Sequence, residues 1–145
     1  MRKMVFLLIA ILISIPAFAA AGGTVSSEGA QKIKAEEALE ILKQAYSGRS
    51  SERFFSMVSQ EPYFKIVDLK FDLTKHFDTF SQIDWNVVND NVVIENNKVA
   101  IKTHWQKRMV RNQTGNVETS EGSTEFIFIV SEEAKLLDFR GDNPF

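Results

Sequence analysis

The sequence predicts an α+β domain in which three helices come first and an antiparallel sheet follows. After residue 80 the 145-residue chain has four runs rich in β-branched and aromatic residues, with short polar turns between them. Connections this short join neighbouring antiparallel strands, so the runs predict a four-stranded meander. The preceding segment has helical periodicity and must cover the apolar face of that sheet. The expected shape is a curved sheet packed on three helices, a cone-shaped roll.

The first 19 residues are expected to form a signal peptide. Arg2-Lys3 is a charged n-region, Met4–Ile15 is almost entirely apolar, and Ala17-Phe18-Ala19 has the small-x-small pattern of a cleavage site. The alternative is an uncleaved membrane anchor, but a span needs about 20 apolar residues and this run is shorter. The sequence therefore predicts an exported protein, periplasmic or secreted, with three parts: a signal peptide (1–19), a flexible lead-in (20–29) and a single domain (30–145).

The composition argues against several classes of protein. There is no cysteine, which excludes a disulfide framework, a thiolate metal site, a cysteine nucleophile and a lipid-modified N-terminal cysteine. Loss of Arg2 and Lys3 leaves 15 of the 17 basic residues against 19 acidic ones, a net charge of −4 that is unfavourable for nucleic acid. His76 and His104 have no acidic cluster around them, and no glycine-rich phosphate loop is present. We expect no metal, no cofactor, no nucleic acid and, after cleavage, no membrane contact.

Three helices are expected before the sheet. The first begins near Ser27–Ala30, where serine can cap a helix, and it stops at Gly48, which tolerates a left-handed conformation. Ser50 or Ser51 can cap a short second helix. The third helix has one buried face, formed by Ile66, Leu69, Leu73, Phe77 and Phe80.

The predicted strands are Ile83–Glu95, Lys98–Val110, Val117–Ser131 and Lys135–Arg140. Apolar and polar residues alternate along them, so one set faces the helices and the other faces water. The predicted inward set is Ile83, Trp85, Val87, Val99, Ile101, Thr103, Trp105, Phe126, Phe128, Val130, Leu137 and Phe139.

Two features interrupt this alternation. Asn89-Asp90-Asn91 lies inside the first strand and predicts a bulge that would curl the sheet. Ile127 and Ile129 place apolar surface on the outer face, where a second copy of the chain could pack to form a homodimer.

Several short motifs give the chain a family resemblance. Ala45-Tyr46-Ser47-Gly48 precedes a helix with Phe54-Phe55, a long strand ends in Trp105, Gly122 opens an aromatic strand, and Gly141–Phe145 closes the sequence. From about residue 30 to residue 145 the chain resembles the nuclear-transport-factor-2-like superfamily, a cone-shaped α+β group. That group includes SnoaL-like cyclases, ketosteroid isomerases and many exported domains of unknown role. One departure is Arg49, where an acidic residue often follows the glycine, and none of the shared motifs is a catalytic signature.

The resemblance implies a pocket between the helices and the curled sheet, and dimers that form through the sheet. Such a pocket would be lined by aromatic and aliphatic side chains, suited to a small apolar molecule and poor at stabilising developing charge. The expected lining residues are Tyr46, Phe55, Leu73, Phe77, Trp85, Ile101, Trp105, Phe126 and Phe128.

Asp72 and His76 are the candidate catalytic pair. They lie four residues apart, so they share one helix face, and the carboxylate could orient the imidazole as a general acid–base group. The competing interpretation is a solvated pair on a face that also carries lysines. His104, Asp84 and Asp138 alternate with inward residues and are expected on the outer face.

Two motifs of the turns have simple explanations. Arg140-Gly141-Asp142 spells an adhesion tripeptide, but glycine and aspartate after a strand are ordinary turn residues. Asn112-Gln113-Thr114 is a glycosylation sequon on a predicted hairpin tip, and it matters only in a host that glycosylates.

Three functions remain open at the level of sequence. The first is a non-catalytic exported domain that binds a small apolar ligand or a protein partner. The second is an isomerase or dehydratase that uses Asp72 and His76. The third is a structural dimerisation domain whose interior is filled by its own aromatic side chains. An inward His76 favours the second function, and a filled interior favours the third.

Export predicts a mature chain that begins at Ala20, because Ala17 and Ala19 occupy the small-residue positions of the cleavage site. Intact mass of protein recovered from the periplasmic or secreted fraction measures this directly. A species that retains Met4–Ile15 would contradict cleavage and indicate an anchor.

Overall fold

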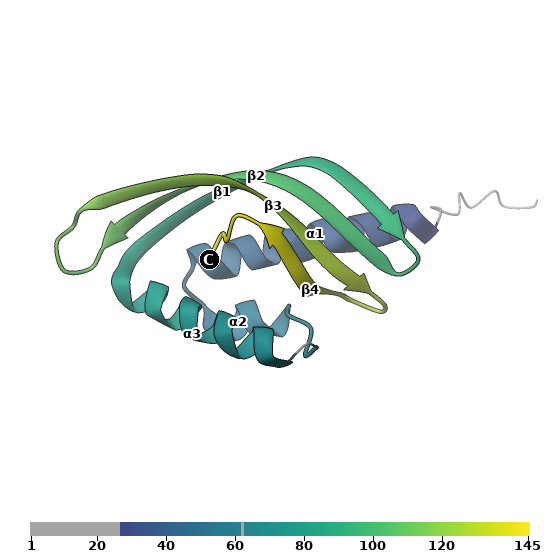
Figure 1. Cartoon of the computed structure of the whole chain (residues 1–145), viewed down its shortest axis with the longest axis horizontal. Helices are drawn as coiled ribbons and strands as arrows, with labels where there is room; N and C mark the ends of the chain where they lie inside the picture. Colours follow the sequence, from purple (N-terminus) through teal and green to yellow (C-terminus); the bar gives the residue numbers. More distant parts are fainter. Residues whose placement is uncertain (1–26, 62) are drawn as a thin grey trace, which may run out of the picture.

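The computed structural model describes residues 27–61 and 63–145, so the expected signal peptide and the lead-in up to residue 26 lie outside the described part. Three helices precede four strands (Figure 1). The elements are α1 (Ser27–Ser47), α2 (Ser51–Ser56), α3 (Tyr63–Thr79), β1 (Phe80–Glu95), β2 (Lys98–Arg111), β3 (Val117–Val130) and β4 (Ala134–Gly141).

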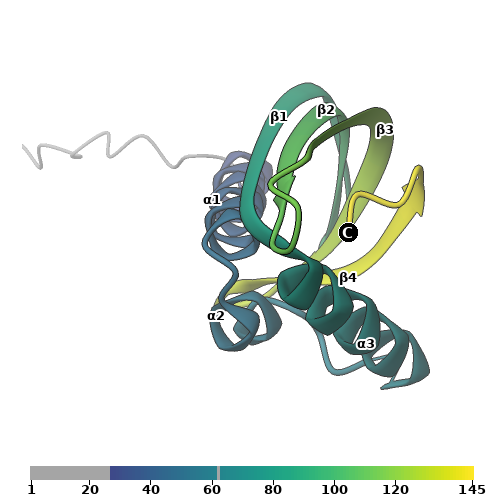
Figure 2. The same ribbon diagram turned by 90° about the vertical axis from the view of Figure 1, so that its left-hand side faces the viewer.

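The strands form one antiparallel sheet in the order β1-β2-β3-β4, which confirms the predicted meander. The sheet curls over the helices, and the last residues of the chain lie inside the curve (Figure 2). A parallel bridge between Val58 and Leu136 joins the segment after α2 to β4. The α+β cone predicted from the sequence is therefore confirmed. Within the described residues, no helix has the length and apolar content needed to cross a membrane.

The inward faces of the central strands are those that alternation predicts. Val99, Ile101, Thr103 and Trp105 of β2 are buried, as are the phenylalanines of β3 at positions 126 and 128. The predicted bulge in β1 is also present: Asn89 pairs with Thr103 and Asn91 with Lys102, so the residue between them has no partner. The buried face of β1 consequently changes from odd-numbered residues before the bulge to even-numbered ones after it.

One inward assignment is wrong, and a second bulge explains it. In β4 Leu136 pairs with Phe128, whereas Asp138 pairs with Ile127, and Leu137 is the extra residue between them. Leu136 is 2% exposed and takes the inward place predicted for Leu137. Leu137 instead contributes to a hollow on the outer face together with Ile127. Phe139, beyond the bulge, packs against the core as predicted.

The ends of two helices also differ from the prediction. Phe80 is buried but opens β1 instead of closing α3. Arg49, not Gly48, adopts the left-handed conformation after α1, with φ of 55°. This turn directs the Arg49 guanidinium at the end of α3, where it donates to the carbonyls of Phe77 (2.6 Å) and Ser81 (3.2 Å). Carbonyls at a helix end lack intrahelical partners, so the bond to Phe77 satisfies one such group in the last turn of α3, and the bond to Ser81 connects the start of β1 to the same guanidinium.

A small polar network holds Trp105 in place. The Trp105 Nε1 donates to Thr124 Oγ1 (2.8 Å), and Thr124 Oγ1 donates to the carbonyl of Asp142 (2.5 Å). Gly122 pairs with Trp105 across the strands, and a Cβ there would lie 2.6 Å from Trp105 Cζ2. Only glycine at position 122 leaves space for the indole of Trp105. The chain after β4 also lies here, because the carbonyl of Asp142 accepts from Thr124.

Candidate functional site

The interior contains one charged side chain, Lys107, among the described residues that are buried. It lies two positions after Trp105 on the inward face of β2 and is 5% exposed. Its Nζ donates to the carbonyl of Pro144 (2.6 Å) and to the Tyr46 Oη (3.4 Å). None of the ion pairs formed by the described residues includes it. A buried ammonium that lacks a carboxylate partner is expensive, and such groups mark candidate sites.

Burial has a direct effect on the charge of this group. It lowers the pKa of Lys107 from 10.5 to about 8, since the charged form loses its hydration inside the protein. Aromatic rings offset part of that loss: Nζ lies 5.2 Å from the centroid of the Trp105 ring and 5.6 Å from that of Tyr46. At neutral pH the side chain is still mostly protonated, so a positive charge lies inside an aromatic interior.

Tyr46 and His76 extend the polar contact from Lys107 toward α3. The Tyr46 Oη lies 2.9 Å from His76 Nδ1. Burial raises the pKa of Tyr46, which therefore keeps its proton. Burial and the Lys107 charge lower the pKa of His76, against the opposing effect of Asp72, and this lowering favours the neutral imidazole. Because the ammonium has only protons to donate, Tyr46 accepts from Lys107, and it donates to His76 in the tautomer whose Nδ1 carries no proton.

The structure separates the two residues of the proposed catalytic pair. His76 is half-buried and directed at Tyr46, whereas Asp72 is exposed and makes no hydrogen bond with it. Asp72 acts on the imidazole only as a nearby charge. The charge of Lys107, a residue that the sequence reasoning missed, has a larger effect on the pKa of His76 than the charge of Asp72 has. The signal was present, because the alternation that ends at Trp105 places Lys107 inward when it is continued by one more step.

The side chains expected to line a pocket form the packed interior instead. Eight of the nine are buried, and Phe55 is partly buried against the same cluster. Phe145 lies at the centre of this cluster: its ring centroid is 5.0 Å from Phe54, 5.4 Å from Tyr46 and 5.5 Å from Trp85. A recess of about 30 Å³ beside Val58 has room for roughly one water molecule. The chain itself therefore occupies the space where a ligand pocket was expected.

The larger hollows lie at the surface of the domain. One of about 940 Å³ is bordered by Asp84, Arg108 and Glu121 of three neighbouring strands, and its lining also includes Ser47, Trp85 and Lys107. Another hollow, of about 600 Å³, lies at the end of the sheet where β1 turns into β2, beside Glu95 and Lys98. As predicted, Asp84, Asp138 and His104 are on the outer face of the sheet, where they pair with Arg108, Lys65 and Asp90 respectively. These contacts are solvated and contribute little to stability.

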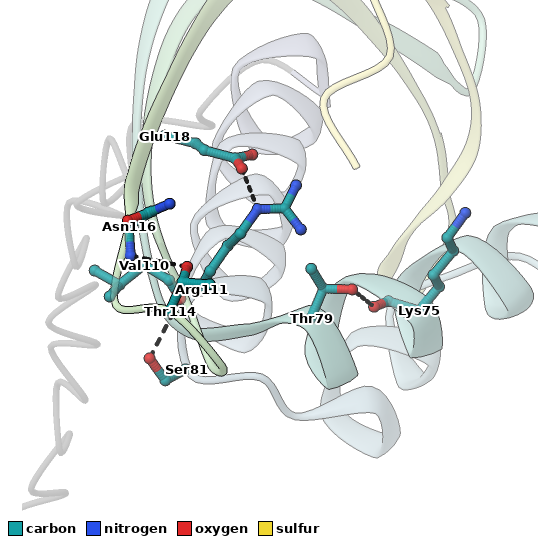
Figure 3. Close-up of polar contacts among 8 residues, drawn as sticks. All are labelled: Lys75, Thr79, Ser81, Val110, Arg111, Thr114, Asn116 and Glu118. Atoms are coloured by element: carbon teal, nitrogen blue, oxygen red, sulfur yellow. Dashed lines mark hydrogen bonds and ion pairs between the residues drawn. The ribbon is translucent and has the colours of Figure 1, made fainter.

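A third group of polar contacts closes the end of the cone near α3 (Figure 3). Arg111 forms an ion pair with Glu118, and its guanidinium lies 5.5 Å from the centroid of the Phe80 ring. Asn112, the sequon asparagine, donates its side-chain amide to the carbonyl of Asp78 (2.7 Å), and its backbone N–H donates to Thr79. These contacts connect the β2–β3 turn to the last turn of α3, so the sequon asparagine helps to hold these two elements together.

No three histidine, aspartate or glutamate side chains gather in a metal-binding arrangement within residues 27–61 and 63–145. The polar groups that do converge in the interior are an ammonium, a phenol and an imidazole. This set suits a negatively charged or carbonyl-bearing partner better than a cation.

No protein-family model matches this chain, and no curated protein sequence matches it. Solved structures do. A nuclear transport factor 2-like superfamily protein from Salmonella enterica has a TM-score of 0.68 at 10% identity, over 83% of this chain and 94% of that one. A ketosteroid isomerase-like protein from Erwinia carotovora atroseptica has a TM-score of 0.60 at 12% identity, over 77% and 96%. A hexachlorocyclohexane dehydrochlorinase has a TM-score of 0.60 at 10% identity, over 80% and 89%.

The chain therefore has the nuclear-transport-factor-2-like fold, and the resemblance inferred from its motifs is confirmed. Ligand-binding proteins share this fold with isomerases and dehydratases, so the fold alone does not assign an activity. The function has to be argued from the interior and from the outer face of this particular chain.

Lys107 predicts a pH dependence of stability. Its folded-state pKa of about 8 lies below the ordinary 10.5, so between these values the unfolded protein binds more protons. The free energy of unfolding should therefore rise with pH in that window, by at most about 1.4 kcal/mol per pH unit. Urea unfolding of wild type and Lys107→Met from pH 7 to about pH 9.5, below the ordinary tyrosine pKa, measures this. Parallel pH profiles of the two proteins would contradict it.

Proposed function

We propose that this protein is an exported, non-catalytic domain that acts through the outer face of its sheet and binds a second copy of itself there. The filled interior is the observation that supports it best. Tyr46, Phe126 and Phe128 are fully buried, and Phe145 occupies the centre between helices and sheet. A domain whose interior is already packed has its outer surface available for recognition. Export rests on the N-terminal sequence pattern alone.

An apolar strip crosses the outer face and gives it a candidate contact. It takes one residue from each strand: Val93, Ala100, Ile127 and Leu137. The first three are aligned by register, with Val93 opposite Ala100 and Ala100 opposite Ile127. Val93 is 45% exposed, and the other three are partly exposed in the isolated chain. Apolar side chains in a row on a strand face are the usual centre of a contact between sheets or subunits.

The charges around this strip favour a second copy as the partner. Lys102 stands opposite Glu125 in the row beside it, and Glu95 stands opposite Lys98 on the other side. A surface with both signs on its rim can complement itself when a two-fold axis brings each charge against its opposite. A partner that is strongly acidic or strongly basic would find half of these charges repulsive.

An acid–base enzyme is the second candidate, because Lys107, Tyr46 and His76 form a hydrogen-bonded chain that could move a proton. A general base must come within about 3 Å of the proton that it abstracts. Lys107 and Tyr46 are buried, and Phe145 packs against the Tyr46 ring. Phe145 thus covers the phenol in the middle of this chain of groups, whereas Lys107 also borders the hollow of about 940 Å³.

Ile127→Lys should shift a dimer to monomer, because it places a charge in the middle of the apolar strip. Val117→Lys is the matched control, since Val117 is 52% exposed on β3 ten residues from Ile127. Sedimentation velocity over a range of concentrations measures the association, and circular dichroism checks that both variants are folded. A wild type that stays monomeric at high concentration would contradict the proposal. Equal loss of dimer in Ile127→Lys and Val117→Lys would also contradict it.

A further inference from the structure

The last residues of the chain are buried in the interior but make few hydrogen bonds there. Gly141, at φ of 97°, turns the chain out of β4. Asp142 is still held by the sheet: its N–H donates to Ser123 O, and its carboxylate accepts from Ser123 N. Beyond Asp142, the described contacts include a single hydrogen bond to the rest of the protein, from Lys107 Nζ to Pro144 O. We call residues 143–145 the closing segment.

The closing segment is held mainly by the burial of its last two residues: Pro144 is fully buried, and the ring of Phe145 is 5% exposed. That ring makes edge-to-face contacts with Tyr46, Phe54, Trp85 and Phe139, at interplanar angles of 69° to 87°. Edge-to-face geometry is specific to aromatic rings, because it sets the positive edge of one against the negative face of another. The interior around Phe145 therefore has the form of a site for an aromatic ring, and an aliphatic group would fit it less well.

Two hydrogen-bond donors beside this ring lack the partners that they require. Lys107 has a neutral carbonyl where a buried ammonium requires a negative charge. Trp85 is directly opposite Lys107 on β1, and its buried Nε1 has no hydrogen-bond partner within residues 27–61 and 63–145. An unpaired buried N–H is a cost that proteins usually avoid. The two donors are neighbours on the inward face of the sheet, and both lie at the ring cluster that Phe145 completes.

We propose that the closing segment occupies a binding site for an aromatic carboxylate and competes with such a ligand for it. The ligand ring would replace that of Phe145, and its carboxylate would replace the Pro144 carbonyl on Lys107. The exchange gives the ammonium a negative partner, and it offers a second oxygen as an acceptor for the unpaired indole N–H. This site lies on the inner side of the sheet, so it is independent of the proposed outer-face dimer.

Competition makes the prediction quantitative. In wild type, a ligand has to displace Phe145 before it binds, so the apparent affinity is reduced by the fraction of molecules in which the segment has left. Phe145→Ala removes the competing ring and leaves an apolar space of about its volume. Spaces of this kind in protein interiors bind small aromatic molecules. The variant should therefore bind a ligand that wild type binds poorly.

Phenylacetate is the probe, since it combines the benzyl group of Phe145 with a carboxylate, and its neutral control is phenylacetamide. Calorimetric titration should show at least 10-fold tighter binding of phenylacetate to Phe145→Ala than to wild type. The preference for phenylacetate over phenylacetamide should disappear in Phe145→Ala/Lys107→Met. Equal affinity of wild type and Phe145→Ala would overturn the competition. A preference for the acid that survives loss of Lys107 would overturn the assignment of the anchor.

Phe145→Leu covers the case in which the alanine variant fails to fold, because it keeps most of the buried volume while it removes the aromatic ring. Here the expected result is again tighter phenylacetate binding than in wild type, by a smaller factor. Cyclohexylacetate tests the specificity of the ring cluster in either variant. Binding as tight as that of phenylacetate would overturn the inference that the site selects aromatic rings.

Discussion

The positive charge of Lys107 inside an aromatic interior is the constraint on which the other parts of this structure depend. Its contacts reach Tyr46 on α1, Trp105 on its own strand and Pro144 at the end of the chain, and Tyr46 carries the connection on to His76 of α3. A single ammonium thus contacts several elements that the sequence keeps far apart. Burial of such a charge is unfavourable, so the carbonyl, the phenol and the aromatic faces must all be in place for the folded state to tolerate it.

The fold of this chain does not by itself determine its function. Proteins with very different activities share the cone, so the role of this chain has to be argued from its own residues. Phe145 and its neighbours fill the space between helices and sheet, while the sheet presents a strip of apolar residues and mixed charges on its other side. The filled interior and the outer strip are the two observations from which the outer-face dimer is proposed.

Much of the fold followed from local patterns, and the site did not. Alternation identified the inward face of the central strands, and the Asn-Asp-Asn run correctly marked the bulge at Asp90. No comparable pattern marks the bulge at Leu137, which depends on how β4 pairs with β3. Lys107 could have been found by continuing the alternation past Trp105. The contact of Tyr46 with His76 joins residues 30 positions apart, and only the packing of α3 against α1 decides it.

The central claim is that Phe145 lies inside the cone, and proton–proton nuclear Overhauser effects in solution test it most directly. With Phe145 placed at 5.4 Å from Tyr46 and 5.5 Å from Trp85 between ring centroids, cross-peaks should connect its ring protons to both side chains. Its ring shifts should also be displaced from random-coil values by the surrounding aromatic rings. Random-coil shifts for Phe145, with no cross-peak to either Tyr46 or Trp85, would contradict the claim that the chain fills its own interior.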